Sequence, residues 1–525
     1  MRVSILLASL IGSCLLFAGC GSDPGNNVAD ALTTDQHDSS AVNLPDAAVD
    51  LRQDVVANSS QDAPDAPSQD MAAPDTRNAL ETSPQDVAGV DAQAATEAGA
   101  GEAGASAGAM ASSSLARATA TLTDTEKRDL ATGLSGFAFA LWQGLRADPS
   151  TQTNFAFSPT SISLALGMAY AGANGNTAAQ MKTTMHIASA NEVYFRSLNW
   201  LDEQLESRAD AALSQAQSLY KSSGSSGTAP DPANFRLHVV NACWGDRTFT
   251  FEQPYLDTLA TDFGSGVHLA DFRTQPDTER IAINTWVSQE TLNRINDLIP
   301  AGAIDTTTRT VLVNAIHLKL PWYDPFLETA TKPATFTKTD GSMASVPFMS
   351  KGGRWSYAED DTTQAVAIPL SGLSVNLVVF LPKATSSLAQ LEDSLSQGHA
   401  TTLVSGMSSQ QVSLTLPKFA FTTASVRLGS VLTALGMTEA FTPNADFTGI
   451  SKEKPLFISE VVHKAMVGVD EHGVEAAAAT AVMLAGSSLP TDIKQVDVNR
   501  PFFFGIYDQP TSTWLFLGHV TDPSS

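Results

Sequence analysis

The sequence predicts an α+β domain in which helices come first along the chain and strands follow in several groups. Three observations support this expectation. Helical spacing of apolar residues dominates residues 122–216, short apolar runs typical of strands recur from residue 237 onwards, and no segment repeats along the chain. The first 114 residues have a different composition and are set apart from this domain.

Two helices open the predicted domain. Apolar residues recur every three or four positions across residues 122–145, and Thr123 with Glu126 forms the sequence pattern of a capping box at the start of this helix. Ser158 and Pro159 start a second helix, because Pro is tolerated in a first helical turn. Helical spacing then continues to about residue 216, and the Ser-, Gly- and Pro-rich residues 221–232 are expected to form a loop.

Strands are expected to dominate the rest of the chain. They are predicted at residues 237–244, 310–318, 365–370, 375–381, 412–421, 502–507 and 514–519. Further helices are predicted at residues 277–292 and 426–435. The run at 310–318 is almost continuously apolar, which is typical of a central strand covered on both faces.

The N-terminus has the pattern of an export signal. Arg2 precedes an apolar stretch too short to span a bilayer, and small residues lead into Cys20. This pattern resembles the lipobox of bacterial lipoproteins, so residues 1–20 are predicted to be a lipoprotein signal with Cys20 as the lipidated residue. An ordinary signal peptide cut near Ala18 is the alternative. No Asp follows the cysteine, so we expect a lipid anchor in the outer membrane or at the cell surface, with an extracellular location as the alternative.

Residues 21–117 are predicted to be a disordered acidic tether rich in Ala, Asp, Pro and Ser. Between residues 21 and 114, sixteen Asp or Glu accompany two Arg, and there is no Phe, Tyr or Trp. Such a segment buries too little apolar surface to offset the entropy of ordering, and its like charges keep it extended. The folded domain is therefore expected at residues 118–525.

The composition of the domain excludes several classes of function. After residue 114 the chain carries 27 Lys or Arg and 39 Asp or Glu, which argues against a nucleic-acid partner. Of the three cysteines only Cys243 lies in the domain, so no disulfide is expected within it. The chain lacks G-x-S-x-G, H-E-x-x-H, a P-loop and paired Cys ligands, so we expect no enzyme activity, no metal and no cofactor.

Five separated stretches resemble the serpin family of protease inhibitors and together cover about residues 122–523. They are residues 154–162 (NFAFSPTSI), 310–322, 446–450 (DFTGI), 469–480 (VDEHGVEAAAAT) and 498–504 (VNRPFFF). The chain departs from the family pattern at Leu320 and Pro321, where relatives usually carry Gly-Lys. The resemblance implies helices packed around a large mixed central β-sheet, with two further sheets and an exposed reactive loop. It also implies a monomer that inhibits serine or cysteine endopeptidases as a suicide substrate, trapping the protease as an acyl complex.

The resemblance assigns the hinge of the reactive loop to Glu471, Gly473, Val474, Glu475, Ala476, Ala477, Ala478, Ala479 and Thr480. In such inhibitors the cut loop enters the central sheet as a new strand. The alternate positions that start at Val474 carry small or apolar side chains, and the only charge, on Glu475, lies in the other phase. No Pro occurs between Gly473 and Leu489, so the pattern permits insertion.

Two features of the hinge leave alternatives open. Residues 475–485 have high helix propensity, so an Ala-rich surface helix is the alternative to an inserting strand. Val474 stands where inhibitory relatives often carry Thr or Ser, and its stiff side chain would slow insertion and favour simple cleavage. A non-inhibitory serpin that acts as a binding protein or decoy substrate is therefore the main alternative, and an adhesion or scaffold lipoprotein is a third.

The scissile bond is predicted between Ser487 and Ser488 by counting forward from the hinge. Counting back from Pro501 places the bond between Leu489 and Pro490 instead. Most serine proteases do not cut a bond that precedes Pro, which favours the earlier site. Small residues at Gly486, Ser487 and Ser488 suit elastase-like pockets, whereas Met483 or Leu484 would suit chymotrypsin- or subtilisin-like enzymes. Lys and Arg are absent from residues 474–491, which argues against trypsin-like targets.

The resemblance also implies a latch that controls opening of the central sheet. Its residues are Ser158, Ser161, Asn314, Trp322 and His463. A buried, hydrogen-bonded polar cluster is expected at this latch, and Trp322 is expected where the top of the sheet first parts.

Overall fold

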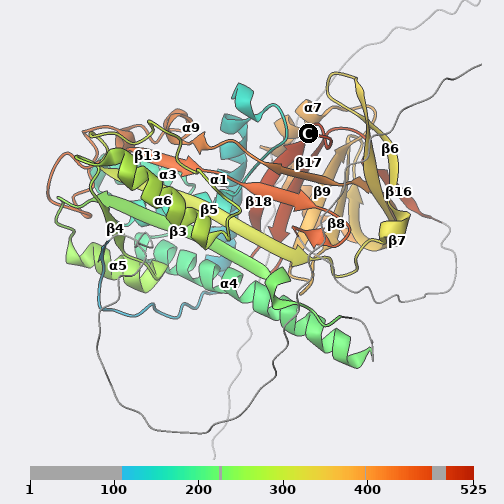
Figure 1. The fold of residues 1–525 in the computed structure, drawn as a ribbon, viewed down its shortest axis with the longest axis horizontal. Helices are drawn as coiled ribbons and strands as arrows, with labels where there is room; N and C mark the ends of the chain where they lie inside the picture. The colour runs from blue at the N-terminus through green and yellow to red at the C-terminus, as the bar shows by residue number, and fades with distance from the viewer. Residues whose placement is uncertain (1–108, 224–227, 397, 476–491) are drawn as a thin grey trace, which may run out of the picture. The chain divides into compact units, whose positions relative to one another are not determined.

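The computed structural model describes residues 109–223, 228–396, 398–475 and 492–525. Within them the predicted α+β class is confirmed, since helices surround two sheets of nine strands each (Figure 1). The α-helices are α1 (Asp124–Leu145), α2 (Pro159–Tyr170), α3 (Gly175–Thr184), α4 (Asn191–Ser222), α5 (Gln253–Phe263), α6 (Pro276–Glu290), α7 (Leu388–Leu395), α8 (His399–Ser405) and α9 (Gly429–Ala434). Single 3-10 turns lie at Pro149–Thr151, Pro232–Asn234, Glu328–Ala330 and Glu439–Phe441.

One sheet, which we call the central sheet, is built around a long strand covered on both faces. Its strands are β1 (Met110–Ala111), β4 (Val267–Ala270), β3 (Arg236–Asp246), β5 (Thr310–Pro321), β15 (Gly473–Val474), β14 (Met466–Val469), β11 (Phe419–Thr422), β12 (Val426–Arg427) and β13 (Glu460–His463). The side chains of β5 contact α2 on one face of the sheet and α6 on the other, and Figure 1 shows α6 lying across β3 and β5. This double burial explains the apolar run that identified β5 in the sequence.

The partners of β5 change along its length. One edge pairs with β3 at residues 310–319, whereas the other edge is parallel to β13 at residues 311–314 and antiparallel to β15 at Leu320 and Pro321. Between these two contacts, residues 315–319 of β5 pair with no described strand on that side. The central sheet is therefore forked beside β5.

The second sheet contains the strands β16 (Lys494–Asp497), β10 (Ser408–Pro417), β7 (Met343–Glu359), β8 (Thr363–Pro369), β9 (Val375–Pro382), β17 (Phe502–Asp508), β18 (Thr513–Val520), β2 (Phe155–Phe157) and β6 (Lys332–Thr337). Two further sheets were expected beside the central one, but the strands form a single second sheet. The 17-residue strand β7 connects its two parts, because the first part of β7 pairs with β6 and β10 and its end pairs with β8.

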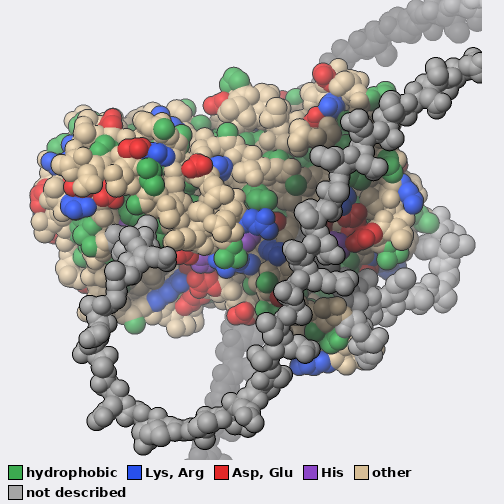
Figure 2. Space-filling model, in the orientation of Figure 1, with side chains coloured by type: hydrophobic (Ala, Val, Ile, Leu, Met, Phe, Trp, Pro, Cys, Tyr) green, Lys and Arg blue, Asp and Glu red, His purple; other side chains and the backbone are tan. Residues whose placement is uncertain are grey.

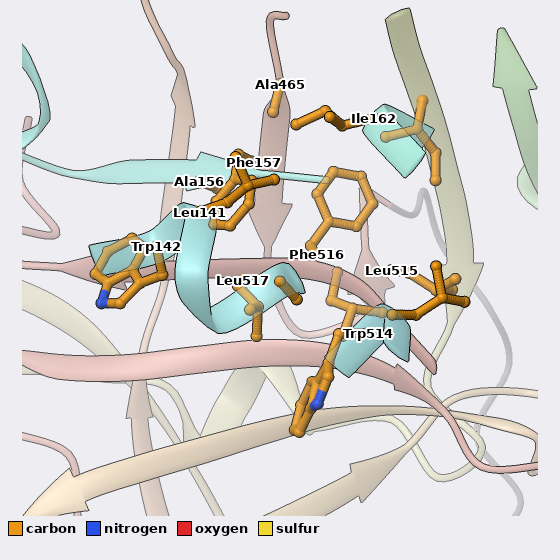
Figure 3. Packing of buried hydrophobic residues seen from close by; sticks show 14 of the residues in the cluster. Leu141, Trp142, Ala156, Phe157, Ile162, Ala465, Trp514, Leu515, Phe516 and Leu517 are labelled. Atoms are coloured by element: carbon orange, nitrogen blue, oxygen red, sulfur yellow. The ribbon is translucent and has the colours of Figure 1, made fainter. Parts of the chain in front are cut away.

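Helix α1 and the end of the chain pack together in the main core. Figure 3 shows Trp142 of α1 and Phe157 of β2 with Trp514 of β18 around one apolar centre. The indole of Trp142 stacks near Phe157, at 6.2 Å between ring centroids, and meets Phe503 edge-on at 4.9 Å. Residues distant in sequence thus close the core by aromatic contacts.

The predicted start of α1 is confirmed in detail. The backbone N–H of Glu126 donates to Oγ1 of Thr123, and the carboxylate of Glu126 accepts from the backbone N–H of Thr123. Each group satisfies a donor that the first helical turn leaves free, which is why this local signal could be read from the sequence.

Three predicted boundaries are wrong, two of them because of strand pairing. Helix α4 continues to Ser222, past the predicted start of the loop at residue 221. The single strand expected at 412–421 is two strands, β10 and β11, which leave Pro417 and Phe419 in different sheets. The helix expected from residue 426 begins at Gly429, because Val426 and Arg427 pair with β13 as the strand β12.

Residues 109–123, which we call the N-terminal strap, lie on the domain rather than ahead of it, although residues up to 117 were expected in the tether. Met110 and Ala111 form β1 against β4, and Ser113 donates to Asp257 of α5 at 2.6 Å. The guanidinium of Arg117 reaches Asn199 and Asp202 of α4, both at 2.7 Å. The strap therefore connects the edge of the central sheet to two helices.

Positive and negative side chains are interspersed on the face of the domain in Figure 2. Cys243 is free and buried, and burial raises the pKa of its thiol to about 12, which keeps the thiol protonated. In the described ranges, no helix has both the length and the apolar character needed to cross a membrane.

Candidate functional site

The candidate site lies along β5 and has two parts. A polar cluster surrounds Asn314 in the first half of the strand, and the hinge contacts the strand at its end. The fork in the central sheet separates the two parts.

The polar cluster contains four of the five predicted latch residues. Ser158, the N-cap of α2, donates its backbone N–H to Nε2 of His463 at 3.0 Å. Because Nε2 accepts, the ring proton lies on Nδ1 and is donated to Oδ1 of Asn314. The amide of Asn314 then donates to Oγ of Ser161 at 2.6 Å and to Oδ1 of Asn241 at 2.7 Å.

These bonds join separate parts of the fold. Asn314 and His463 are paired residues of β5 and β13, at the point where the sheet forks. Ser158 and Ser161 belong to the first turn of α2 beneath the sheet, and Asn241 belongs to β3. The bond between His463 and Asn314 crosses from β13 to β5, and Ser158 and Ser161 tie these two strands to the same turn of α2. Moving β5 and β13 apart would break the first of these bonds and strain the other two, so the cluster is placed to oppose opening of the sheet.

Burial lowers the pKa of His463 to about 3, and its hydrogen bond to Asn314 opposes this shift. The ring is therefore neutral in the folded protein. An unfolded chain binds a proton at its His below about pH 6.5, so folding stability is full above that pH and decreases as the pH falls towards 3.

We expect the free energy of unfolding to fall by about 2 kcal/mol through His463 between pH 6.5 and 5. Urea denaturation at several pH values measures this change. His463→Gln, which has no proton to bind, should show a correspondingly weaker loss over the same interval. Equal pH dependence in the two proteins would contradict the assignment to His463.

The hinge begins with a tight reversal after β14. The carboxylate of Asp470 accepts the backbone N–H groups of His472 and Gly473, at 2.8 and 3.3 Å, which fixes the turn. Glu471 is paired with Lys418 at 2.6 Å and accepts from Thr331 at 2.7 Å. The chain can then return into the sheet as β15.

Trp322 lies at this turn and not in the polar cluster. Its backbone N–H donates to the carbonyl of His472, and its indole N–H donates to the carbonyl of Asp470, both at 2.8 Å. Leu320 and Pro321, where the sequence departs from the family pattern, continue β5 and pair with Val474 and Gly473.

The strand β15 lies between β5 and β14. Val474 pairs with Leu320 on one side and with Val469 on the other. Its side chain is 2% exposed and belongs to the main core, as expected for the inward phase. Glu475 follows, and its side chain contacts Arg294 and His317.

Many of the predicted site residues lie outside the described residues. These are Ala476, Ala477, Ala478, Ala479 and Thr480 of the hinge, the bond residues Met483, Leu484, Gly486, Ser487, Ser488 and Leu489, and Cys20.

The structure brings three further residues to the site that were not predicted: Asn241, Arg294 and His317. Asn241 and His317 interrupt apolar strands with polar side chains, which is the signal that could have found them. Arg294 lies between α6 and β5, where no periodic pattern marks it.

One group of described residues has the ligand types of a metal site, namely Asp470, Glu471 and His472. Lys418 already pairs with Glu471, and Asp470 accepts two backbone N–H groups. These carboxylates are therefore engaged in forming the turn.

Comparisons with known proteins agree with this architecture. An uncharacterised serpin-like protein of Thermococcus kodakarensis is 32% identical over 405 residues, covering 77% of this chain and 88% of the relative. The leukocyte elastase inhibitor of Sus scrofa is 31% identical over 402 residues, covering 75% and 99%.

Two solved structures share the fold at 24% sequence identity. They are the thermophilic serpin tengpin in its native state, with a TM-score of 0.65 and coverage of 77% and 97%, and human thyroxine-binding globulin, with 0.63 and coverage of 76% and 99%. A family model described as Serpin (serine protease inhibitor) matches residues 132–523. The chain therefore belongs to the serpin family.

Proposed function

We propose that this protein is a suicide-substrate inhibitor of serine or cysteine endopeptidases. A protease would cut the reactive loop, and the freed segment would enter the central sheet while the enzyme is still bound as an acyl complex. The observation that carries the proposal is β15, in which the first hinge residues already form a strand between β5 and β14.

The rest of the site supports this mechanism. On the side of β5 where β15 pairs, residues 315–319 have no partner strand in the described part of the chain. This free edge begins where the pairing with β15 ends. Val474, the first residue of the apolar phase, lies in the core. About fifteen further residues at roughly 3.3 Å each would form a strand near 50 Å long, enough to carry an attached protease far from its first contact.

The proposed roles of the residues follow the sequence analysis. The hinge residues 471–480 insert, the polar cluster of Ser158, Ser161, Asn314 and His463 restrains the sheet, and the bond between Ser487 and Ser488 is cut. Small residues at that bond favour an elastase-like target, and one relative is named as an inhibitor of leukocyte elastase. Chymotrypsin- and subtilisin-like enzymes are the other proposed targets.

The test is incubation of the full-length protein with elastase-, chymotrypsin-, subtilisin- and trypsin-like proteases, followed by denaturing gels and mass spectrometry. A complex that survives boiling is expected with at least one of the first three, and the released peptide gives the cut bond. Cleavage within the loop across the whole panel without any complex would contradict inhibition of these enzyme classes.

A non-inhibitory serpin is the second candidate. The stiff side chain of Val474 favours it, and the fold also occurs in thyroxine-binding globulin. The melting temperature after loop cleavage separates the two functions. An increase indicates that the loop inserts, whereas an unchanged value supports a binding protein.

We also propose that the protein is exported and anchored through a lipid on Cys20. The sequence of residues 1–20 supports this location, which would present the inhibitor to proteases at the cell surface.

A further inference from the structure

Glu475 is the last described residue of the hinge and directly follows β15. Its backbone N–H donates to the carbonyl of Gly468 at 2.7 Å, which extends the contact of β15 with β14 by one residue. Its φ is 52°, a left-handed conformation that is unfavourable for a residue with a side chain. Surrounding contacts must hold the chain in this conformation.

Two cationic or ionisable side chains contact the carboxylate of Glu475. Oε1 lies 3.0 Å from Nε of Arg294, and Oε2 lies 3.1 Å from Nε2 of His317. Both contacts are close approaches rather than aligned hydrogen bonds, since neither Oε1 of Glu475 nor the ring nitrogens of His317 have a hydrogen-bond partner. The side chains of Glu475 and His317 are only 9% and 3% exposed, so solvent screens this carboxylate weakly.

Arg294 supplies the permanent charge at this contact. It belongs to the segment between α6 and β5, and so it comes from outside the β5–β14 fork that receives the hinge. If β15 continued in the same register, residue 475 would be extended and would lie opposite Lys319 of β5. The present ion pair therefore belongs to the turned-out conformation of Glu475 and not to a longer inserted strand.

We propose that Arg294 is a positioning residue that holds Glu475 and thereby keeps Gly473 and Val474 seated between β5 and β14 before any protease acts. The pair fixes how far the hinge enters the sheet in the resting molecule. Its importance for inhibition rests on the proposed function, but its effect on the hinge does not.

Hydrogen exchange of the full-length protein tests this inference directly, because the backbone N–H of Glu475 is bonded within the hinge. Peptides covering residues 466–475 are compared by mass spectrometry for wild type, Arg294→Gln, Glu475→Gln and the double variant. We expect each single substitution to accelerate hydrogen exchange in the hinge about tenfold. This is more than the loss of an exposed ion pair would give and less than the loss of a fully buried one. The double variant should exchange no faster than the single ones, since all three remove one shared interaction.

Two controls make the result specific. Arg273 has the same exposure as Arg294, 45%, and its Nε also contacts a buried carboxylate, that of Asp246 at 3.4 Å. Arg273→Gln should leave exchange in the hinge unchanged, and Arg294→Lys, which keeps the charge, should accelerate it less than threefold. The inference is overturned if the exchange rate of the hinge in Arg294→Gln stays within twofold of wild type. It is also overturned if the effects of the two single substitutions add in the double variant, or if Arg273→Gln accelerates exchange as much as Arg294→Gln.

The outcome is independent of the proposed function. Coupled acceleration in a protein that traps no protease would support the positioning role of Arg294 and reject inhibition. Trapping of a protease together with unchanged hydrogen exchange in Arg294→Gln would support inhibition and reject the positioning role of Arg294.

Discussion

On the proposed inhibitory function, Val474→Glu is expected to turn a protease trap into a protease substrate, with a loss of covalent complex of about 100-fold or more. Val474 is buried in the main core, between Leu320 of β5 and Val469 of β14. Because Val474 already lies in the core of the resting protein, a carboxylate at this position is expected to leave the sheet with β15 and must be desolvated before the hinge can return. About 2.7 kcal/mol of added barrier already gives a hundredfold slower step. The protease would then complete hydrolysis before it is carried away.

Denaturing gels with a protease that the wild type traps measure this change as complex against cleaved protein. Val474→Thr has nearly the same shape and serves as the matched control, and it should still form the complex. Full trapping by Val474→Glu would mean that burial of this side chain between β5 and β14 is not needed for inhibition.

Asn314→Ala is expected to lower the free energy of unfolding by about 4 kcal/mol. The substitution removes the acceptor of the His463 ring proton and the donor to Ser161 and Asn241, in a site that is fully buried. Each buried polar group left without a partner costs about 1–3 kcal/mol. For a domain of this size the loss corresponds to a decrease of about 5 °C in the melting temperature.

Thermal unfolding followed by circular dichroism measures this decrease. Asn444→Ala, at an exposed position, is the control and should change stability by less than about 0.5 kcal/mol. A similar decrease in both variants would show that the cluster around Asn314 adds nothing beyond an ordinary surface residue.

The parts of the fold that the sequence predicted well depend on local signals or on complete burial. The capping residues of α1 act within one helical turn, and β5 is apolar because both of its faces are covered. Val426 and Arg427 could not be assigned in the same way. Their strand forms because it pairs with β13, and the residues next to them in the sequence carry no pattern that indicates this pairing.

The candidate site shows the same limit. The residue types at Ser158, Asn314 and His463 matched a family pattern, and the structure brings them into one hydrogen-bonded cluster. The seating of β15 on β5 and the contact between Arg294 and Glu475 depend on distances between segments about 150 and 180 residues apart in the chain. Such distances are set by the packing of the whole domain, and the sequence alone does not contain them.

The strand β1 has a consequence for association between molecules. Its residues pair with Val267 and His268, and the backbone N–H of Leu269 donates to the carbonyl of Ala109 at 2.8 Å. These bonds occupy the outer edge of β4, which would otherwise offer free backbone groups to a strand from another copy. Gly266 permits the close approach, because a side chain there would meet the carbonyl of Ala111 at 2.6 Å. At this edge the strap thus replaces the free side of β4 with a strand of two residues, which offers little surface for edge-to-edge aggregation.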